Sequence, residues 1–268
     1  MTQLIGALCD SKHTVVTVSD RMVSSADMTI TFEPDRPKYS RITDKCVILT
    51  AGTLLEPCLI EDIKEKGKNE LDIRKLVQIC KQEFSSVKTK HMEEEILQPQ
   101  GFTSFSDFHE RSQRLHDAII MQLNESIRRH ELDLILLVAG IDDRGGHLWI
   151  VTDPGSDACF DAVGFCCPGI GQRHTDPVFA LYRYSSAIPP QEALLVAYEA
   201  KKRAEMAGGI GLTTDATIIS KDGVNEILPE TLKELEEIHR DQKERPWQEW
   251  LKSRVEKLEI RTRPLGIT

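Results

Sequence analysis

The N-terminal segment constrains the fold most, because it predicts a β-hairpin that begins directly after the second residue. Residues Gln3–Cys9 are mostly apolar, residues Asp10–His13 read as a polar turn, and residues Thr14–Val18 are β-branched throughout. β-Branched side chains fit the pleated surface of a sheet, and a polar turn between two such runs is typical of a hairpin. We expect His13 to be solvated in that turn.

Thr2 stands at the start of this hairpin and has the chemistry of a nucleophile. Removal of Met1 from a small penultimate residue would make Thr2 the N-terminal residue. A hydroxyl group and a free α-amine would then share one residue, and an α-amine with a pKa of about 8 can take the hydroxyl proton directly or through a water. A Met-Thr start carries little information alone, so the residues that follow decide.

Several features follow the hairpin in a defined order. Ser19-Asp20-Arg21 ends the second strand, and Lys38 precedes a strand at Lys45–Thr50 that runs into Ala51-Gly52 and a helical pattern. This order resembles the N-terminal half of the proteasome β-subunit-like N-terminal nucleophile (Ntn) hydrolases. In that family a Thr opens the first strand, an Asp-Ser-Arg-like triplet ends the second, and a Lys lies fourteen residues before the Gly of an Ala-Gly pair. Lys38 and Gly52 keep that interval.

The later part of the chain also fits this family. It contains a strand, a turn and a returning strand, then a glycine-rich turn before a helix, another helical stretch and a last hairpin. These segments are Asp133–Gly140, Ile141–Gly146, His147–Thr152, Pro168–Gly171, Ala193–Ala207 and Thr214–Gly223. The resemblance covers residues 2–227 with gaps. It implies an α+β fold, the four-layer αββα sandwich of the Ntn hydrolases.

The resemblance also implies roles for the site residues. Thr2 is the nucleophile, Lys38 lowers the pKa of its amine and orients its hydroxyl, and the amide of Gly52 donates to the oxyanion at a helix start. The carboxylate that keeps the lysine charged is assigned to Asp20, with Ser19 as a hydroxyl neighbour. By direct counting Ser19 takes the family's Asp position, and Asp20 fits if the first hairpin is longer. Alternatively, Asp20 pairs with Arg21, and Lys38 is a surface lysine.

The second half of the family's site is weaker in this chain. Gly169-Ile170-Gly171 stands where the family has a Gly-Ser-Gly turn, and its Asp-x-x-Ser motif has no counterpart at 207–214. Those groups tune the threonine amine, and Thr213, Thr214 or Asp215 could replace them. The glycine-rich stretch 207–211 is a weak phosphate-binding alternative, since no Lys-Ser/Thr follows it.

Two stretches interrupt or extend this core. Amphipathic helices are predicted around Ile73–Phe84 and around Leu115–Ile127, the second capped by Ser106-Asp107. Residues 88–106 break the periodicity between them and form an insertion, either functional or simply exposed. Residues 228–268 form a C-terminal helical extension. Its Trp247 and Trp250 stripe packs on the core or meets a partner, and a strand is predicted at Leu258–Arg261.

Composition excludes several function classes. The net charge of −9 gives no electrostatic footprint for nucleic acid or an anionic membrane. Apolar runs are strand-sized and the N-terminus lacks a signal-peptide pattern, so we expect a cytoplasmic protein without a membrane partner. The seven cysteines are expected to be reduced core thiols, the adjacent Cys166-Cys167 being structural rather than a redox or metal site. No histidine forms a zinc helix motif, and neither a metal nor a cofactor is expected.

Two function classes remain. The first is an N-terminal threonine hydrolase that cleaves peptide or small amide substrates through an acyl-enzyme, as a protease or transpeptidase, in a homo-oligomer that can be a ring as in the family. Its interface would use the helical layer Ile73–Ile127. The second is a non-catalytic proteasome-like subunit or binding module that retains the fold.

Overall fold

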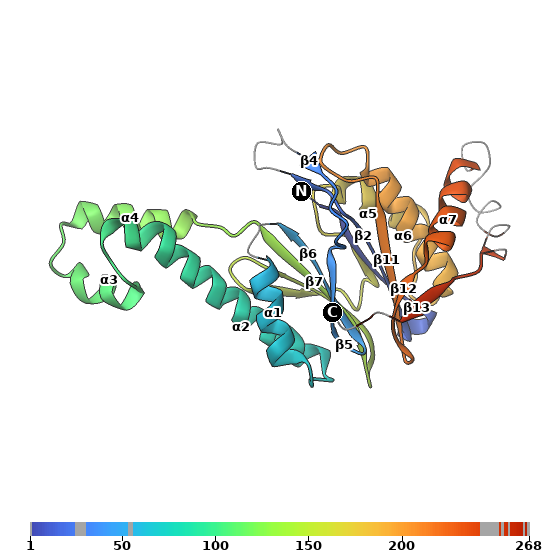
Figure 1. The fold of residues 1–268 in the computed structure, drawn as a ribbon, viewed down its shortest axis with the longest axis horizontal. Helices are drawn as coiled ribbons and strands as arrows, with labels where there is room; N and C mark the ends of the chain where they lie inside the picture. Colours follow the sequence, from blue (N-terminus) through green and yellow to red (C-terminus); the bar gives the residue numbers. More distant parts are fainter. Residues whose placement is uncertain are drawn as a thin grey trace.

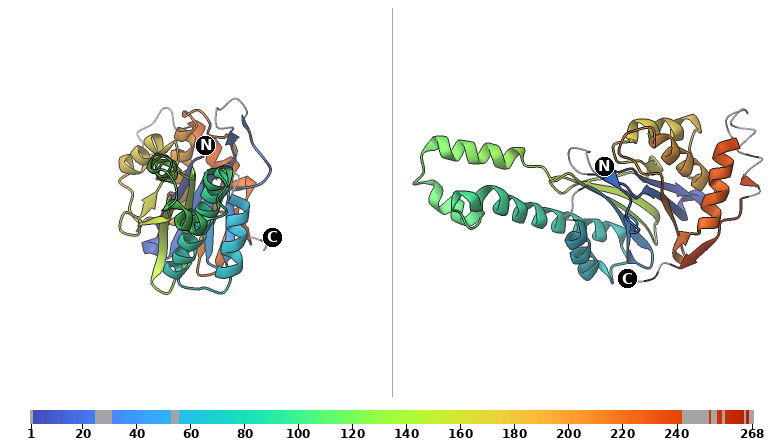
Figure 2. Two further views of the ribbon diagram at one scale, coloured as in Figure 1. Left: turned by 90° about the vertical axis from the view of Figure 1, so that its left-hand side faces the viewer. Right: turned by 45° about the horizontal axis from the view of Figure 1, so that its top comes forward.

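The chain folds into a mixed α+β structure with two larger antiparallel sheets (Figure 1). The computed structural model describes residues 2–24, 31–52 and 56–241, together with residues 252, 255, 256, 258–264 and 266. Helices lie on the outer sides of the two sheets, and a long helical arm projects from one side (Figures 1 and 2).

The first sheet has six strands and contains the predicted N-terminal hairpin. Its order is β10-β1-β2-β11-β12-β13, and every pairing is antiparallel. The strands are β1 (Leu4–Cys9), β2 (Thr14–Asp20), β10 (Phe165–Cys166), β11 (Thr214–Ser220), β12 (Gly223–Ile227) and β13 (Thr262–Pro264). A short turn of 3-10 helix, Asp10–Lys12, joins β1 to β2, and His13 after it is exposed as expected.

The second sheet has five strands in the order β5-β6-β7-β8-β9. They are β5 (Tyr39–Thr43), β6 (Cys46–Gly52), β7 (Leu134–Asp142), β8 (Gly145–Thr152) and β9 (Ser156–Cys159). The predicted hairpin around residues 133–152 is β7–β8, with a tighter turn than expected because the strands stay paired up to Asp142 and Gly145. A separate two-stranded ribbon pairs β3 (Val23–Ser24) with β4 (Thr31–Phe32).

Alternation along the strands places apolar side chains on both faces of each sheet. Leu4 and Leu8 of β1 join Val47 of β6 and Leu137 of β7 in an apolar cluster between the two sheets. The intervening Ile5 of β1 belongs to a different cluster on the outer side of the six-stranded sheet. The two sheets therefore pack face to face, and β1 is buried on both sides.

Helices cover the two outer faces. On the six-stranded sheet lie α5 (Gln172–Leu181), α6 (Pro190–Ala204) and α7 (Pro229–Asp241). On the five-stranded sheet lie α1 (Glu56–Gly67) and the first half of α2 (Ile73–Met92). The α2 stripe predicted from the sequence is confirmed, since Ile73, Leu76, Val77, Cys80 and Phe84 are all buried in this layer.

The second half of α2 enters the projecting arm (Figure 2). The arm continues through a π-helical turn (Glu93–Leu97), a 3-10 turn (Gln98–Gln100), α3 (Phe105–Ser112) and α4 (Asp117–Arg129). Its small apolar cluster contains Leu97, Phe102, Phe108 and Leu123. The segment 88–106 is therefore largely helical, and Gly101 ends the 3-10 turn in the left-handed conformation with φ 83°.

The N-cap predicted for the helix around Leu115–Ile127 was wrong. Ser104, not Ser106-Asp107, is the N-cap, and its hydroxyl accepts a hydrogen bond from the amide of Asp107 at 3.2 Å. The single predicted helix is also divided, because a break after Ser112 separates α3 from α4, which His116 caps. The break disrupts the expected stripe, so that Ile119 is exposed while Leu123 is buried.

The C-terminal extension adds a helix and an edge strand. Leu235 of α7 is buried against α6. The strand predicted at Leu258–Arg261 lies further along, at Thr262–Pro264, because the Arg261 carbonyl instead accepts a hydrogen bond from the Leu228 amide at 2.7 Å. The predicted tryptophan stripe, Trp247 and Trp250, lies outside the described residues.

Two of the sequence predictions about environment can be compared with the structure. Cys166 and Cys167 are buried core thiols, and burial raises the pKa of each. The same expectation was wrong for Cys58 and Cys159, which are exposed. Among the described residues, no helix is long and apolar enough to cross a membrane.

Candidate functional site

Thr2 is held at the start of β1 by backbone contacts on two sides. The amide of Ile170 donates to the Thr2 carbonyl at 3.2 Å, and the next amide, that of Gln3, donates to Asp20 Oδ1 at 2.9 Å. Gly169 lies against the same carbonyl with φ +133°, and a Cβ atom there would stand 2.2 Å from the Thr2 oxygen. Only glycine fits this position, so the turn at residues 169–171 fixes the backbone of Thr2.

Asp20 ends β2 fully buried and accepts three backbone hydrogen bonds. Its Oδ1 accepts from Gln3, and its Oδ2 accepts from the amides of Met22 at 2.9 Å and Gly211 at 3.0 Å. Charge-assisted bonds of this kind are stronger than neutral ones. Asp20 does not pair with Arg21, which instead bonds both carboxylate oxygens of Asp215 at 2.6 and 2.8 Å.

Lys38 brings the predicted residues together. Its Nζ donates to the hydroxyl of Thr2 and to the carbonyl of Met22, and it lies 3.5 Å from both carboxylate oxygens of Asp20. The Lys38 side chain is only 11% exposed, so it is not a surface lysine. Its carbonyl accepts from the Thr50 amide at 3.0 Å, which ties the lysine to strand β6.

This arrangement can support proton transfer at a hydroxyl. An ammonium group lies between a threonine oxygen and a buried carboxylate, which stabilises the positive charge on the amine. A cation beside the hydroxyl stabilises the alkoxide that forms when the hydroxyl loses its proton. The three side chains come from β1, β2 and the segment before β5, and each is fixed by backbone hydrogen bonds.

Ser19 lies beside Asp20 but faces a different environment. Its strand partners are Leu4 on β1 and Asp215 on β11, and its Oγ is buried without a hydrogen-bond partner among the described residues. The Gln3 side chain also has one polar atom without a hydrogen-bond partner. Its Nε2 donates to Leu4 and Cys167 carbonyls at 2.9 and 3.0 Å, whereas its Oε1 has no partner there.

Gly52 ends strand β6 rather than beginning a helix. Helix α1 starts at Glu56, and the intervening residues 53–55 lie outside the described residues. Gly52 has φ +133°, and a Cβ atom would stand 1.8 Å from the Asp133 carbonyl, so the position requires glycine. The expectation that Gly52 opens the helix was therefore wrong, although it lies two residues beyond the Thr50–Lys38 hydrogen bond.

Lys201 is a buried lysine that sequence reasoning missed. Its Nζ donates to Glu205 at 2.6 Å and to the Leu212 carbonyl at 2.9 Å, and its side chain is fully buried. Burial lowers the pKa of Lys201, against the opposing effect of Glu205. It positions the loop from which Gly211 donates to Asp20. The signal was available in α6, where Lys201 lies on the same helical stripe as Leu194 and Ala197.

The polar residues expected to replace the missing family motif have other partners. Thr213 donates its hydroxyl and amide to Glu33, and Asp215 pairs with Arg21. Burial raises the pKa of the Glu33 carboxyl, but the Thr213 hydrogen bonds outweigh this effect and the pKa is lowered overall. Thr214 pairs with Asp20 along the strands. These contacts support the loop around the Thr2 site instead of reaching Thr2.

A second charged cluster surrounds His147 on β8. Its Nδ1 lies 2.6 Å from Asp161 and its Nε2 lies 3.0 Å from Asp142. The hydrogen bond to Asp161, and then that to Asp142, raise the pKa of His147 against the effect of burial. Asp142 also bonds Arg144 at 2.6 Å. No nucleophilic hydroxyl is bonded to this cluster among the described residues.

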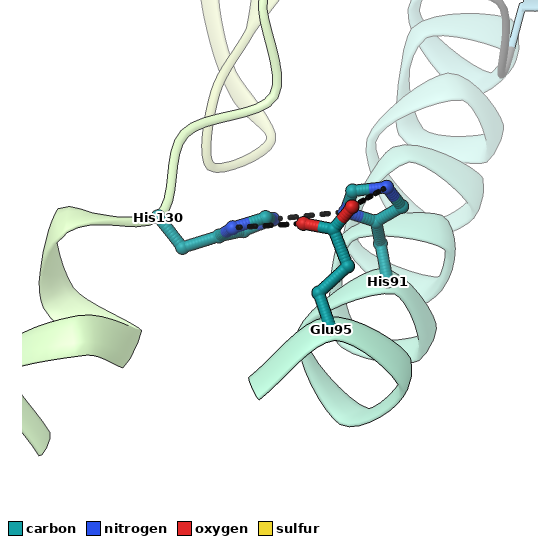
Figure 3. A group of neighbouring side chains, drawn as sticks. All are labelled: His91, Glu95 and His130. Carbon is teal, nitrogen blue, oxygen red and sulfur yellow. Dashed lines mark hydrogen bonds and ion pairs between the residues drawn. The ribbon is translucent and has the colours of Figure 1, made fainter. Parts of the chain in front are cut away.

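A third group, His91, Glu95 and His130, has donor atoms close enough to hold a metal ion (Figure 3). His91 Nδ1 lies 3.1 Å from His130 Nε2, and His91 Nε2 lies 3.3 Å from a Glu95 oxygen. Burial, and then the neighbouring His91, lower the pKa of His130. This group lies in the arm, on different elements from Thr2 and Lys38.

The chain matches no protein-family model, and no curated protein shows a significant sequence match to it. The resemblance to the Ntn hydrolases therefore depends on the order and spacing of its residues.

Proposed function

We propose that this protein is an Ntn-type threonine hydrolase that acts on amide or peptide bonds. The observation that carries the proposal is the contact of Lys38 with both the Thr2 hydroxyl and the Asp20 carboxylate. The layer order supports the finer fold assignment, a four-layer αββα sandwich, because helices cover the outer faces of two sheets that pack on each other.

The proposed reaction begins once Met1 is removed and Thr2 carries a free α-amine. The Thr2 oxygen attacks the amide carbonyl while its proton passes to the amine, directly or through a water. Lys38 stabilises the developing negative charge on the hydroxyl oxygen, and the Gly52 amide is the proposed donor to the tetrahedral oxyanion. The C–N bond then breaks, the proton moves to the leaving amine, and an ester to Thr2 remains. Water or another amine resolves that ester, giving hydrolysis or transpeptidation.

Modification of Thr2 by an electrophile tests the proposal directly. A β-lactone or epoxyketone probe should add one adduct to the processed protein, located at Thr2 by peptide mass spectrometry. Thr2→Ala and Lys38→Ala should abolish the adduct. Lys75→Ala is a matched control because its side chain is 70% exposed, and this variant should be labelled like the wild type. Labelling that persists in the first two variants would assign the nucleophile elsewhere.

The state of residue 2 is an independent test of the same mechanism. Because threonine is small, the protein from its native cells should lose Met1, which an intact-mass spectrum measures. Quantitative retention of Met1 would exclude a threonine nucleophile with its own amine as base.

The alternative is a non-catalytic proteasome-like subunit. The observation favouring it is that Thr213 and Asp215 are bonded to Glu33 and Arg21, so the described residues supply no second set of groups around the threonine. A processed, folded protein that fails to react with every N-terminal threonine electrophile would support this alternative.

We also propose a homo-oligomer that uses the helical layer Ile73–Ile127, with the arm as part of the interface. Sedimentation or light scattering across micromolar concentrations tests this state. A monomer throughout that range would reject it and would leave a small amide or one dedicated protein tail as the substrate.

A further inference from the structure

The arm has two legs, one formed by the end of α2 with the π-helical turn and the other by α4. At the base of the arm, two histidines and a glutamate from these legs lie close together. His91 belongs to the last turn of α2, and Glu95 lies one turn further, in the π-helical segment Glu93–Leu97. His130 caps the C-terminal end of α4, where the chain returns toward β7. Figure 3 shows the three side chains pointing toward one another across the space between the legs.

The spacing of the donor atoms fits a small metal ion. One ligand atom from each residue can be chosen so that all lie within 4.8 Å of one another, and the two imidazoles approach to 3.1 Å. Zinc–nitrogen bonds of about 2.0–2.1 Å in a tetrahedron place neighbouring donors about 3.3 Å apart. The Glu95 side chain, 56% exposed, faces both rings, with one oxygen 3.3 Å from His91 Nε2 and the other 3.9 Å from His130 Nδ1.

The surrounding contacts hold the two legs at this separation. Asp153 accepts a hydrogen bond from the Leu132 amide at 2.8 Å, and Lys88 of α2 pairs with the same carboxylate. The chain just after His130 is therefore fixed to the turn of α2 just before His91. Glu93 fixes the other side, because its carboxylate accepts from the Phe105 amide at 2.8 Å.

We propose that His91, Glu95 and His130 form a binding site for Zn²⁺ that joins the two legs of the arm. Two imidazoles and one carboxylate are a donor set that zinc prefers, and they leave one of four coordination positions for a water. π-Helical turns occur often at functional sites, and this one contains the carboxylate ligand.

The metal would bridge the two legs of the arm, with a water completing its coordination as in zinc sites of three protein ligands. Beyond the site the legs are joined by one small apolar cluster, whose buried members are Leu97, Phe102, Phe108 and Leu123. A zinc ion at the base would close the loop of chain between residues 95 and 130 and restrict separation of the legs. This role does not depend on Thr2 or on the proposed hydrolase activity.

Metal titration of the untagged, full-length protein tests the site. After treatment with a chelator and its removal, the wild type should bind one equivalent of Zn²⁺ in a calorimetric titration, and Co²⁺ should give the visible bands of a tetrahedral complex. His91→Ala and His130→Ala should each weaken Zn²⁺ binding by more than about 100-fold, since even outer groups of metal sites contribute 10- to 100-fold.

His109→Ala is the matched control, because His109 is an exposed arm histidine on α3 outside the site. It should bind zinc like the wild type. Glu95→Gln gives a third ligand variant with minimal change in shape, and circular dichroism checks that each variant folds. Absence of zinc binding by the wild type at micromolar concentration would overturn the proposal. One-equivalent binding that survives in folded His91→Ala and His130→Ala would overturn it as well.

Discussion

A charged cluster lies near each end of the β1–β2 hairpin: the His147 cluster of β7 and β8 beside the turn, and the cluster of Thr2, Asp20 and Lys38 at the open end. The two clusters differ in how their polar atoms are paired. At the turn end, the two ring nitrogens of His147 are hydrogen-bonded to the carboxylates of Asp161 and Asp142. Asp161 also accepts a hydrogen bond from the Leu148 amide at 2.8 Å. At the open end, Lys38 Nζ donates to the Thr2 hydroxyl, and Ser19 Oγ lacks a partner among the described residues.

The difference shows that buried charge alone does not identify a catalytic site. Both clusters contain a buried carboxylate and a basic side chain, but only the cluster at Asp20 joins segments that are distant in sequence. Only the open end places a hydroxyl in contact with the base. Full pairing at His147 is typical of a structural network, whereas incomplete pairing beside a hydroxyl leaves groups available to a bound molecule.

The largest expected effect is on the reactivity of Thr2, which belongs to the cluster at the open end of the hairpin. Lys38→Met should lower the rate of Thr2 modification by about 10³-fold or more, because the alkoxide loses its neighbouring cation. The free energy of unfolding should fall by only about 1–2 kcal/mol, since Asp20 keeps three backbone donors. Adduct formation followed by mass spectrometry gives the rate, and urea unfolding gives the stability. Equal losses in both measurements would make Lys38 a structural residue.

Asp20→Asn should affect both measurements. An amide side chain offers one acceptor oxygen where Gln3, Met22 and Gly211 supply three donors, so an N–H group would face an N–H group. We expect a loss of about 2–4 kcal/mol in stability and slower modification of Thr2. A variant of Asp20 with unchanged stability would contradict the hydrogen bonding described for this carboxylate.

His147→Gln should have the opposite profile to Lys38→Met. Removing one partner of a mostly buried charge network should cost about 2 kcal/mol of stability. The rate of Thr2 modification should stay at the wild-type value when measured under conditions where both proteins are folded. A large fall in rate without loss of stability would show that the two clusters are coupled.

The contribution of His147 should also depend on pH. Its pKa is raised in the folded state above the ordinary value of 6.5, so the folded protein binds the proton more tightly than the unfolded chain. The stabilisation is complete below the unfolded pKa and is lost as the pH rises through the folded pKa. The difference in unfolding free energy between wild type and His147→Gln should therefore shrink as the pH rises above the ordinary histidine pKa of 6.5. A difference that grows with pH would contradict a raised pKa of His147 in the folded state.

The smallest effect is expected at Ser19. Its Oγ has no partner, so Ser19→Ala removes an unsatisfied polar atom and should change stability by less than about 1 kcal/mol. Thr2 modification should be nearly unchanged. A strong loss of modification would favour Ser19 over Asp20 as the residue that serves the family's carboxylate position.

Local sequence patterns predicted the parts of this fold that are determined by residues close together in the chain. The hairpin from Gln3 to Val18 follows from apolar and β-branched runs around a polar turn, and the structure confirms it. The spacing of Lys38 brought it into the predicted set, and the structure places it against Thr2 and Asp20. The choice of Asp20 over Ser19 for contact with Lys38 depended on the true hairpin length, which the turn at Asp10–Lys12 determines.

Other features depend on contacts between distant segments and could not be predicted locally. The division of the second arm helix into α3 and α4 follows from packing around Phe108 and Leu123, because no strong helix breaker lies at residues 113–116. His91 and Glu95 are four residues apart, but His130 joins them only when the arm turns back. The helical stripe places Lys201 on the buried face of α6, but its hydrogen bond to the Leu212 carbonyl depends on the loop that follows the helix.

The long-range hydrogen bonds around Thr2 and Asp20 have a consequence for the order of folding. Asp20 receives its last donor from Gly211, 191 residues away in the chain, and Thr2 is held by Ile170. Contacts of such long sequence separation form late, because the intervening chain must first be ordered. The group of Thr2, Asp20 and Lys38 is therefore assembled fully only in the complete fold. If Thr2 is the nucleophile that we propose, a nascent or partly unfolded chain carries it without Lys38 and Asp20 beside it, and the reactivity of Thr2 should appear only on complete folding.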